Sequence, residues 1–221
     1  MSEAFAFLND IVDYGPQILS GLINTLILAG TISVTGLLAG ILIFRLTLSD
    51  NEIIRKSTAR YISFFIGTPL IVLLFLMYYG LPQWGINFSP FTIAVIGFTL
   101  NIAAYNSRYL SAAYNGIDQH QLMAASAQGF SSRQIFTLII LPQTLRRAIP
   151  GLTNQVALNI KDSSIAFLIQ YVDFFAQMQE QASLNFQYLK VYAVTGAVYL
   201  LLVSLVIFAS KRLETRYAIP H

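Results

Sequence analysis

The chain has 221 residues, of which 56% are hydrophobic and only 10% are charged. Soluble domains carry about 25% charged residues, so the composition excludes an ordinary soluble globule and indicates an integral membrane protein. The net charge is +3. We attribute the basic residues, which lie between apolar segments, to membrane topology and expect no nucleic-acid binding.

The first seventeen residues do not read as a secretory signal. They open with Glu3, Asp10 and Asp13 and lack a basic region and a small-residue cleavage site. We expect residues 1–17 to form a short amphipathic lead-in outside the cytoplasm, with Pro16 suited to the start of the first membrane helix.

Five apolar runs are long enough to cross a bilayer, which takes about 20 mainly apolar residues. The third run contains Asn101 and Arg108, and the fourth contains Lys161 and Asp162, so these two are weaker by hydropathy. The fold class predicted is therefore an all-α integral membrane protein with five spans. The runs cover residues 18–44, 62–79, 91–113, 149–171 and 191–210.

Two local features predict how these helices pack. Gly36 and Gly40 form a small-xxx-small pair, which permits close helix approach. Pro69 interrupts the second run and frees a backbone carbonyl that a neighbour must satisfy, so we expect a bend there.

Eleven of the thirteen basic residues fall on one side of these spans: between spans one and two, between spans three and four, and after span five. By the positive-inside rule that side is cytoplasmic, so the N-terminus lies outside and the C-terminus inside. Residues 216–221 would form a cytoplasmic tail.

The segment 118–142 is a patterned cytoplasmic loop. Asp118 with Gln121 forms a capping-box pattern that begins a helix over about residues 119–128, and Gly129 suits the position after its end. Ser131 with Gln134 repeats the pattern and begins a second helix, which Pro142 must end or kink.

The first of these helices carries small side chains, among them Ala124, Ala125 and Ala127, so a partner surface can approach it closely. It has no Lys or Arg between 119 and 128. A helix lying on lipid headgroups usually shows basic residues on one face and Trp, Phe or Leu on the other. A docking helix for a cytoplasmic partner is therefore favoured over a surface loop on lipid.

Ionisable and polar residues at membrane depth are costly and commonly face a cavity or each other. We therefore expect the polar residues of the third and fourth runs to line a substrate pathway. Asp162 in that pathway could accept hydrogen bonds from the ammonium of an amino acid. An internal ion pair or interhelical contact is the alternative. Lys161 and Asp162 are adjacent and point some 100° apart, so different partners are expected. The candidates are Asn101, Asn159, Lys161, Asp162, Ser163 and Ser164.

The spacing of Ala124-Ala125, Gly129, Ile139 and Leu141-Pro142 resembles the signature cytoplasmic loop of ABC importer permeases, Glu-Ala-Ala, Gly, nine residues, Ile-x-Leu-Pro. The stretches "GTPLIVLLFLMYYGLP", "AAYNS", "LPQTLRRAIPGLTNQ" and "KDSSI" extend the resemblance to the polar amino-acid subgroup over residues 18–215.

This resemblance implies a permease domain over 18–215 whose loop 118–142 is a coupling helix for an ATPase. It implies two cytoplasmic ATP-binding subunits, a second permease subunit and an extracytoplasmic amino-acid-binding protein, in a bacterial cytoplasmic (inner) membrane. The chain has no G-x-x-x-x-G-K-[ST] motif, so ATP and Mg would be bound by the partner and none by this chain. The coupling residues implied are Gln121, Met123, Ala124, Ala125, Gly129, Leu141 and Pro142.

Several positions depart from the family pattern. Met123 stands where Glu is expected, His120 where Gly is usual, and Arg108 with Ser111 replace an expected Glu and Arg. These changes favour the interpretation that the chain is one half of a heterodimer whose partner permease keeps the regular residues. A homodimer remains the alternative.

The chain has no cysteine and only two histidines, His120 and His221, so we expect no metal site. An ATP-independent secondary transporter or channel subunit, or an anchor for an unrelated complex, remains the alternative to an ABC permease. The sequence does not name the amino acid.

Overall fold

The structure, a computed structural model, describes residues 14–217, and every regular element in that part of the chain is a helix. Elements η1 and η3 are π-helical, and η2 and η4 are 3₁₀-helical. The order is α2 (Gly15–Thr47), α3 (Glu52–Gly67), α4 (Leu70–Phe75), η1 (Leu76–Gly80), η2 (Leu81–Trp84), α5 (Pro90–Tyr114), α6 (Gln119–Ala127), α7 (Ser132–Gln134), η3 (Ile135–Ile140), α8 (Leu141–Asp162), η4 (Ser163–Ile169), α9 (Phe174–Asn185) and α10 (Tyr188–Tyr217).

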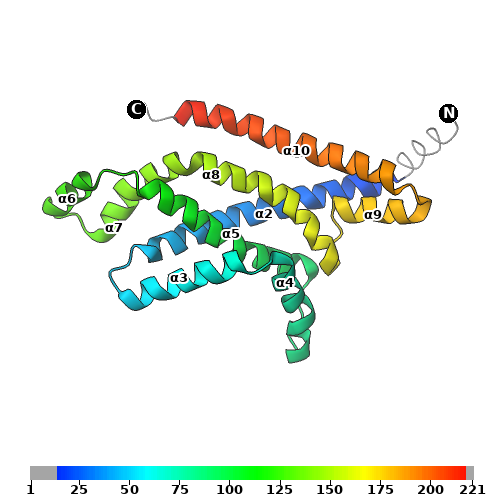
Figure 1. Ribbon diagram of the computed structural model, residues 1–221, viewed down its shortest axis with the longest axis horizontal. Coiled ribbons are helices and arrows are strands. Elements are labelled where there is room, and N and C mark those ends of the chain that lie inside the picture. Colours follow the sequence, from blue (N-terminus) through cyan, green and yellow to red (C-terminus); the bar gives the residue numbers. More distant parts are fainter. Residues whose placement is uncertain (1–13, 218–221) are drawn as a thin grey trace.

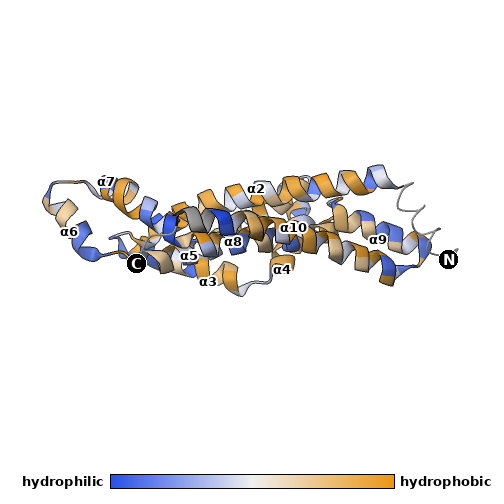
Figure 2. Cartoon of the chain, turned by 90° about the horizontal axis from the view of Figure 1, so that it is seen from above, coloured by the Kyte–Doolittle hydropathy of each residue, from blue (hydrophilic) through white to orange (hydrophobic). Residues whose placement is uncertain are grey.

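The long helices form an elongated bundle with two distinct ends (Figure 1). Helices α6 and α7, the α2–α3 connection and the end of α10 lie at one end, and α9 lies with the start of α2 at the other. Figure 2 shows hydrophobic residues along the helices between these ends and hydrophilic residues around α6 and α9. Predicted features of residues 1–13 and 218–221, including most of the lead-in, lie outside the described residues.

By length and hydropathy, two described helices could cross a membrane, at Gly15–Thr47 and Tyr188–Arg212. The pair Glu52–Gly67 and Leu70–Trp84 would be a third if it counts as one span. Helices α5 and α8 cover most of the remaining two predicted runs. Their polar residues lower the mean hydropathy, so these two helices do not meet the criterion of length and hydropathy. The fourth run is also not one helix to its end, since α8 stops at Asp162 and η4 follows.

The chain bends by 99° between α3 and α4, where Pro69 lies. A proline has no amide hydrogen, so the carbonyl of Phe65, four residues earlier, has no donor within the helix. The side chain of Asn101 on α5 supplies one, with its Nδ2 donating to the Phe65 oxygen at 2.8 Å. The predictions that Pro69 bends the helix and that a neighbour satisfies the freed carbonyl are confirmed.

Helices α2 and α5 form the most extensive interface of the bundle. Gly36 and Gly40 are both buried on the face of α2 that meets α5. A Cβ atom on Gly36 would lie 2.4 Å from Cγ2 of Ile102, and one on Gly40 would lie 2.6 Å from Cβ of Asn106. The pair therefore serves close packing inside the chain.

The start of α9 is fixed by a buried carboxylate. Asp173 is fully buried, and its Oδ1 accepts from the amide of Ala176 at 2.8 Å. Thr25 on α2 accepts from the next amide, that of Phe174, at 3.0 Å. Burial raises the pKa of Asp173 from its ordinary value of 3.8 to about 7, against the lowering effect of the Ala176 hydrogen bond.

The loop between α5 and α8 follows its predicted caps in part. Asp118 accepts from the amide of His120 at 2.9 Å, α6 runs over Gln119–Ala127, and Gly129 has a φ of +86°. The full capping box between Ser131 and Gln134 is present.

One local prediction in this loop is wrong: the side chain of Gln121 does not complete a capping box with Asp118, because it pairs with Gln143 on α8. Of the two outcomes expected at Pro142, an end or a kink of the helix, the first does not occur, since π-helix η3 leads directly into α8 with Pro142 in its first turn. The first turn of a helix tolerates a missing amide donor, which is why the helical path continues there.

Candidate functional site

A cavity of about 410 Å³ lies between the α3–α4 break, the middle of α5 and the end of α8. Irregular backbone at membrane depth is tolerated where it lines such a cavity. The lining residues are Ile66, Gly67, Thr68, Pro69, Leu70, Asn101, Tyr105, Gln155, Leu158, Asp162 and Ile165.

This cavity presents hydrogen-bond acceptors. Asp162 contributes a half-buried carboxylate. Oε1 of the buried Gln155 has no hydrogen-bond partner among the described residues, while its Nε2 donates to Asn159 at 2.9 Å. Helix α3 ends at Gly67 in the wall, and a helix C-terminus carries unpaired carbonyls and a partial negative charge. The cavity therefore complements a cationic, donor-rich group.

The structure divides the predicted substrate-pathway residues between two cavities. Asn101 and Asp162 line the first, whereas Lys161 and Ser164 line a second of about 440 Å³ beside α9 and α10. Lys161 and Asp162, for which different partners are expected, line different cavities, and among the described residues they make no ion pair with each other within 4 Å.

Asn159 and Ser163 line neither of these two cavities. Asn159 is buried, and its Nδ2 donates to Oγ of Ser33 on α2 at 2.9 Å. Ser163 is fully buried and donates to the carbonyl of Ile160 at 2.8 Å. Asn159 thus joins α8 to α2, whereas the Ser163 hydroxyl is bonded to the backbone of the preceding turn.

Sequence reasoning missed two polar residues of the first cavity. Gln155 lies seven residues before Asp162 on α8, and Tyr105 lies four residues after Asn101 on α5. Each therefore shares a helix face with a predicted substrate-pathway residue. Tracing polar residues at helical spacing would have found both. The wall at Thr68 could not be found, because it depends on how far the chain bends.

The predicted coupling residues lie on α6 and where η3 meets α8. Met123 is 59% exposed, and Ala124 and Gly129 are exposed, whereas Ala125 is buried against the loop. Leu141 packs in the apolar cluster around Phe44, and Pro142 is exposed.

Helix α6 is tied to the start of α8 by a reciprocal amide pair. Nε2 of Gln121 donates to Oε1 of Gln143 at 3.3 Å, and Nε2 of Gln143 donates to Oε1 of Gln121 at 3.0 Å. Elements α7, η3 and α8 then run without a break to Asp162 in the cavity wall. A single helical segment thus joins the loop to the cavity.

The comparisons with known proteins agree with one another. A family model described as "Binding-protein-dependent transport system inner membrane component" matches residues 32–218. The "Probable amino-acid ABC transporter permease protein YckA" of Bacillus subtilis (strain 168) is 34% identical over 203 residues, covering 92% of this chain and 90% of that protein. The "Arginine transport system permease protein ArtQ" of the same strain is 31% identical over 202 residues, covering 91% and 92%.

Among solved structures, one described as an amino acid ABC transporter with histidines is similar to this chain with a TM-score of 0.84 at 30% identity. The similarity covers 93% of this chain and 96% of that one. By sequence and by fold, the chain belongs to the family of binding-protein-dependent transport system inner membrane components, the permease subunits of ABC transporters.

Proposed function

We propose that this permease subunit serves an importer that moves a polar amino acid across the inner membrane, and that the amino acid passes through the cavity at Asp162. The observation that carries the proposal is the acceptor-lined cavity at a broken helix, in a chain whose relatives include an arginine transport permease. Broken membrane helices commonly form the substrate sites of transporters.

The ammonium of the substrate, or a cationic side chain, would donate to the Asp162 carboxylate and to Oε1 of Gln155. The C-terminus of α3 would add favourable charge. The cavity volume of about 410 Å³ suits a small molecule, since ligand pockets usually measure about 300–1,000 Å³. Asn101 is committed to the Phe65 carbonyl, so its role would be to hold the broken helix in place.

The chain is not itself a catalyst, because ATP hydrolysis belongs to a separate subunit in this family. Cytoplasmic ATP-binding subunits would dock on α6, whose exposed Ala124 and Met123 allow a close approach. Movement of α6 would reach Asp162 through the Gln121–Gln143 pair and the continuous segment from α7 to α8.

The remaining parts of the assembly follow from the family and the charge pattern. Five spans with the N-terminus outside, a second permease subunit and an extracytoplasmic binding protein would complete the transporter. Exposed Met123 and Arg108, which depart from the family pattern, would contact partners that compensate for them, which favours a heterodimer.

The cavity is tested by Asp162→Asn in the reconstituted transporter, with Glu52→Gln as the control. Glu52 is an exposed carboxylate that forms an ion pair with Lys56 at 2.8 Å. Losing one charge-assisted hydrogen bond costs about 1.5–3 kcal/mol, so we expect the concentration for half-maximal uptake to rise about tenfold or more. Uptake identical to that of Glu52→Gln would reject Asp162 as a substrate contact.

The link from α6 to the cavity is tested by Gln143→Ala, with Gln128→Ala as its control because Gln128 is exposed at the end of α6. We expect Gln143→Ala to retain ATPase binding but to lower the amount of amino acid transported per ATP. An unchanged ratio would show that the amide pair does not transmit movement.

A further inference from the structure

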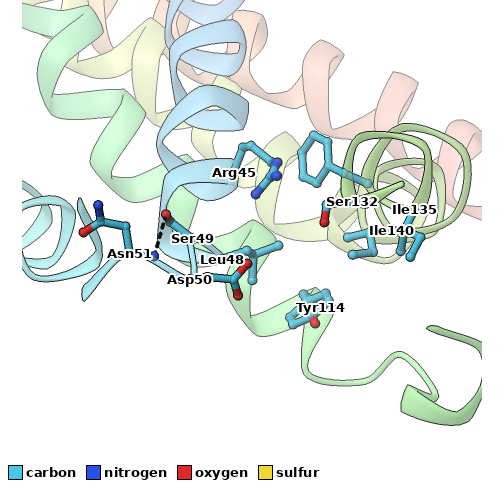
Figure 3. A pocket seen from close by; sticks show the side chains of 10 residues that line it. Arg45, Leu48, Ser49, Asp50, Asn51, Tyr114, Ser132, Ile135 and Ile140 are labelled. Atoms are coloured by element: carbon cyan, nitrogen blue, oxygen red, sulfur yellow. Dashed lines mark hydrogen bonds between the residues drawn. The ribbon is translucent and has the colours of Figure 1, made fainter. Parts of the chain in front are cut away.

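A third cavity, of about 340 Å³, lies at the end of the bundle that holds α6 and α7 (Figure 3). The last turn of α2 and the loop after it form one side, with Arg45, Leu48 and Asp50, and the start of the α7–η3 segment forms the other, with Ser132 and Phe136. It shares no lining residue with the cavity at Asp162.

The cavity contains one cation and one anion that are not paired with each other. The guanidinium of the half-buried Arg45 lies 5.2 Å from the centre of the Phe136 ring, and no carboxylate among the described residues lies within 4 Å of it. Figure 3 shows Arg45 on the same side as Ser132, with Asp50 on the side nearer Tyr114. Both charges are therefore available to a ligand that carries the opposite pair.

The surroundings place this cavity at a membrane boundary. Arg45 follows directly after the apolar run 18–44. The lining itself includes the half-buried Leu48 and Ile135, and Leu42, one turn before Arg45 on α2, is 60% exposed. Apolar side chains around a charged pocket suit contact with acyl chains, and basic pockets beside membrane helices commonly bind lipid headgroups.

We propose that this cavity binds a zwitterionic phospholipid. The phosphate accepts hydrogen bonds from Arg45 and from the hydroxyl of Ser132, and the headgroup ammonium lies toward Asp50. The acyl chains lie along the half-buried Leu48 and Ile135 and over the exposed Leu42. This site is independent of the amino-acid pathway and would stabilise the junction where α7 leaves the α6 loop.

The same pair of charges could be offered by a soluble zwitterion, such as a free amino acid. The apolar surface at the site distinguishes the two sources, because only a lipid would gain from covering Leu42, Leu48 and Ile135. A competition with the soluble headgroup alone therefore separates them.

The test uses the transporter purified with its ATPase subunits and native mass spectrometry with added phosphatidylethanolamine. Diacylglycerol with the same acyl chains is the matched lipid, and glycerophosphoethanolamine is the soluble competitor. We expect phosphatidylethanolamine to be retained, diacylglycerol to be retained at least tenfold less, and millimolar glycerophosphoethanolamine to displace little lipid. Equal retention of diacylglycerol, or full displacement by the soluble headgroup, would overturn the proposal.

Variants then locate the site. Arg45→Gln should weaken retention about tenfold, as expected for one charge-assisted contact, whereas Arg60→Gln, the same change at an exposed position of α3, should not. Asp50→Asn should lower the preference for phosphatidylethanolamine over phosphatidylglycerol. Equal effects of Arg45→Gln and Arg60→Gln would refute the site. If Arg45→Gln does not assemble, the retention of phosphatidylethanolamine relative to diacylglycerol on the unaltered protein tests the proposal.

Discussion

Replacing Gly40 by alanine should loosen the main helix interface of the protein. The added Cβ would lie 2.6 Å from Cβ of Asn106, whereas carbon atoms in contact prefer about 3.5–4.0 Å. Because a Cβ atom is held by the backbone, rotation of a side chain cannot relieve the overlap, and α2 and α5 must separate by about 1 Å. Overpacking of this kind costs about 1–3 kcal/mol.

Gly30→Ala on the same helix provides the matched control. Beyond its own stretch of helix, no atom of residues 14–217 lies within 4 Å of a Cβ built at Gly30, so this variant keeps the gain in helix propensity that both substitutions share, about 1 kcal/mol. For a chain of this size about 1 kcal/mol shifts the Tm by roughly 2–4 °C. An overlap of about 2 kcal/mol should therefore place the Tm of Gly40→Ala about 4–8 °C below that of Gly30→Ala. Thermal unfolding in detergent measures this difference, and equal Tm values would refute the packing role of Gly40.

Three further predictions concern single side chains. Between about pH 4 and 7 the buried Asp173 keeps a proton that the unfolded chain has released, so stability should fall as pH rises through this window and level off above it. Asp173→Asn should remove that slope in Tm measured against pH, and a slope unchanged in the variant would assign it to other groups. Asn101→Leu leaves the Phe65 carbonyl without its donor and should cost about 1–3 kcal/mol of stability; a Tm equal to that of the unaltered protein would show that another group satisfies the carbonyl. Gly129→Ala forces a residue with a Cβ into a φ of +86° at a cost of about 1–2 kcal/mol, so amide hydrogen exchange in α6 should accelerate while exchange in α5 stays the same. Unchanged exchange in α6 would mean that the turn relaxes without loss.

Local signals in the sequence predicted the elements that depend on short-range contacts. The caps at Asp118 and Ser131, the positive φ at Gly129 and the bend at Pro69 each follow from one residue and its near neighbours. Gln121 shows the limit of such reasoning, because Gln143, which is 22 residues away, takes the side chain that a capping box would have used. The helical path through Pro142 likewise depends on the π-helical turn before it.

The candidate site was predictable as a set of polar residues but not as a cavity. Helical geometry alone separates Lys161 from Asp162, yet which of them faces Asn101 depends on how α5 and α8 pack. Asn159 was expected in the pathway and is instead bonded to Ser33, more than a hundred residues away. The unpaired oxygen of Gln155 could be recognised only once its neighbours were in place.

The central claim, that this chain forms the membrane pathway of an ATP-driven amino-acid importer, is tested most directly by transport in proteoliposomes. The chain would be purified with the ATPase, permease and binding protein encoded beside it, and uptake of labelled polar amino acids would be measured with ATP and with a non-hydrolysable analogue. We predict accumulation only with hydrolysable ATP, and a rise of about tenfold or more in the concentration for half-maximal uptake in Asp162→Asn. Uptake that proceeds equally without ATP, or the failure of any ATPase to co-purify with the chain, would contradict the account.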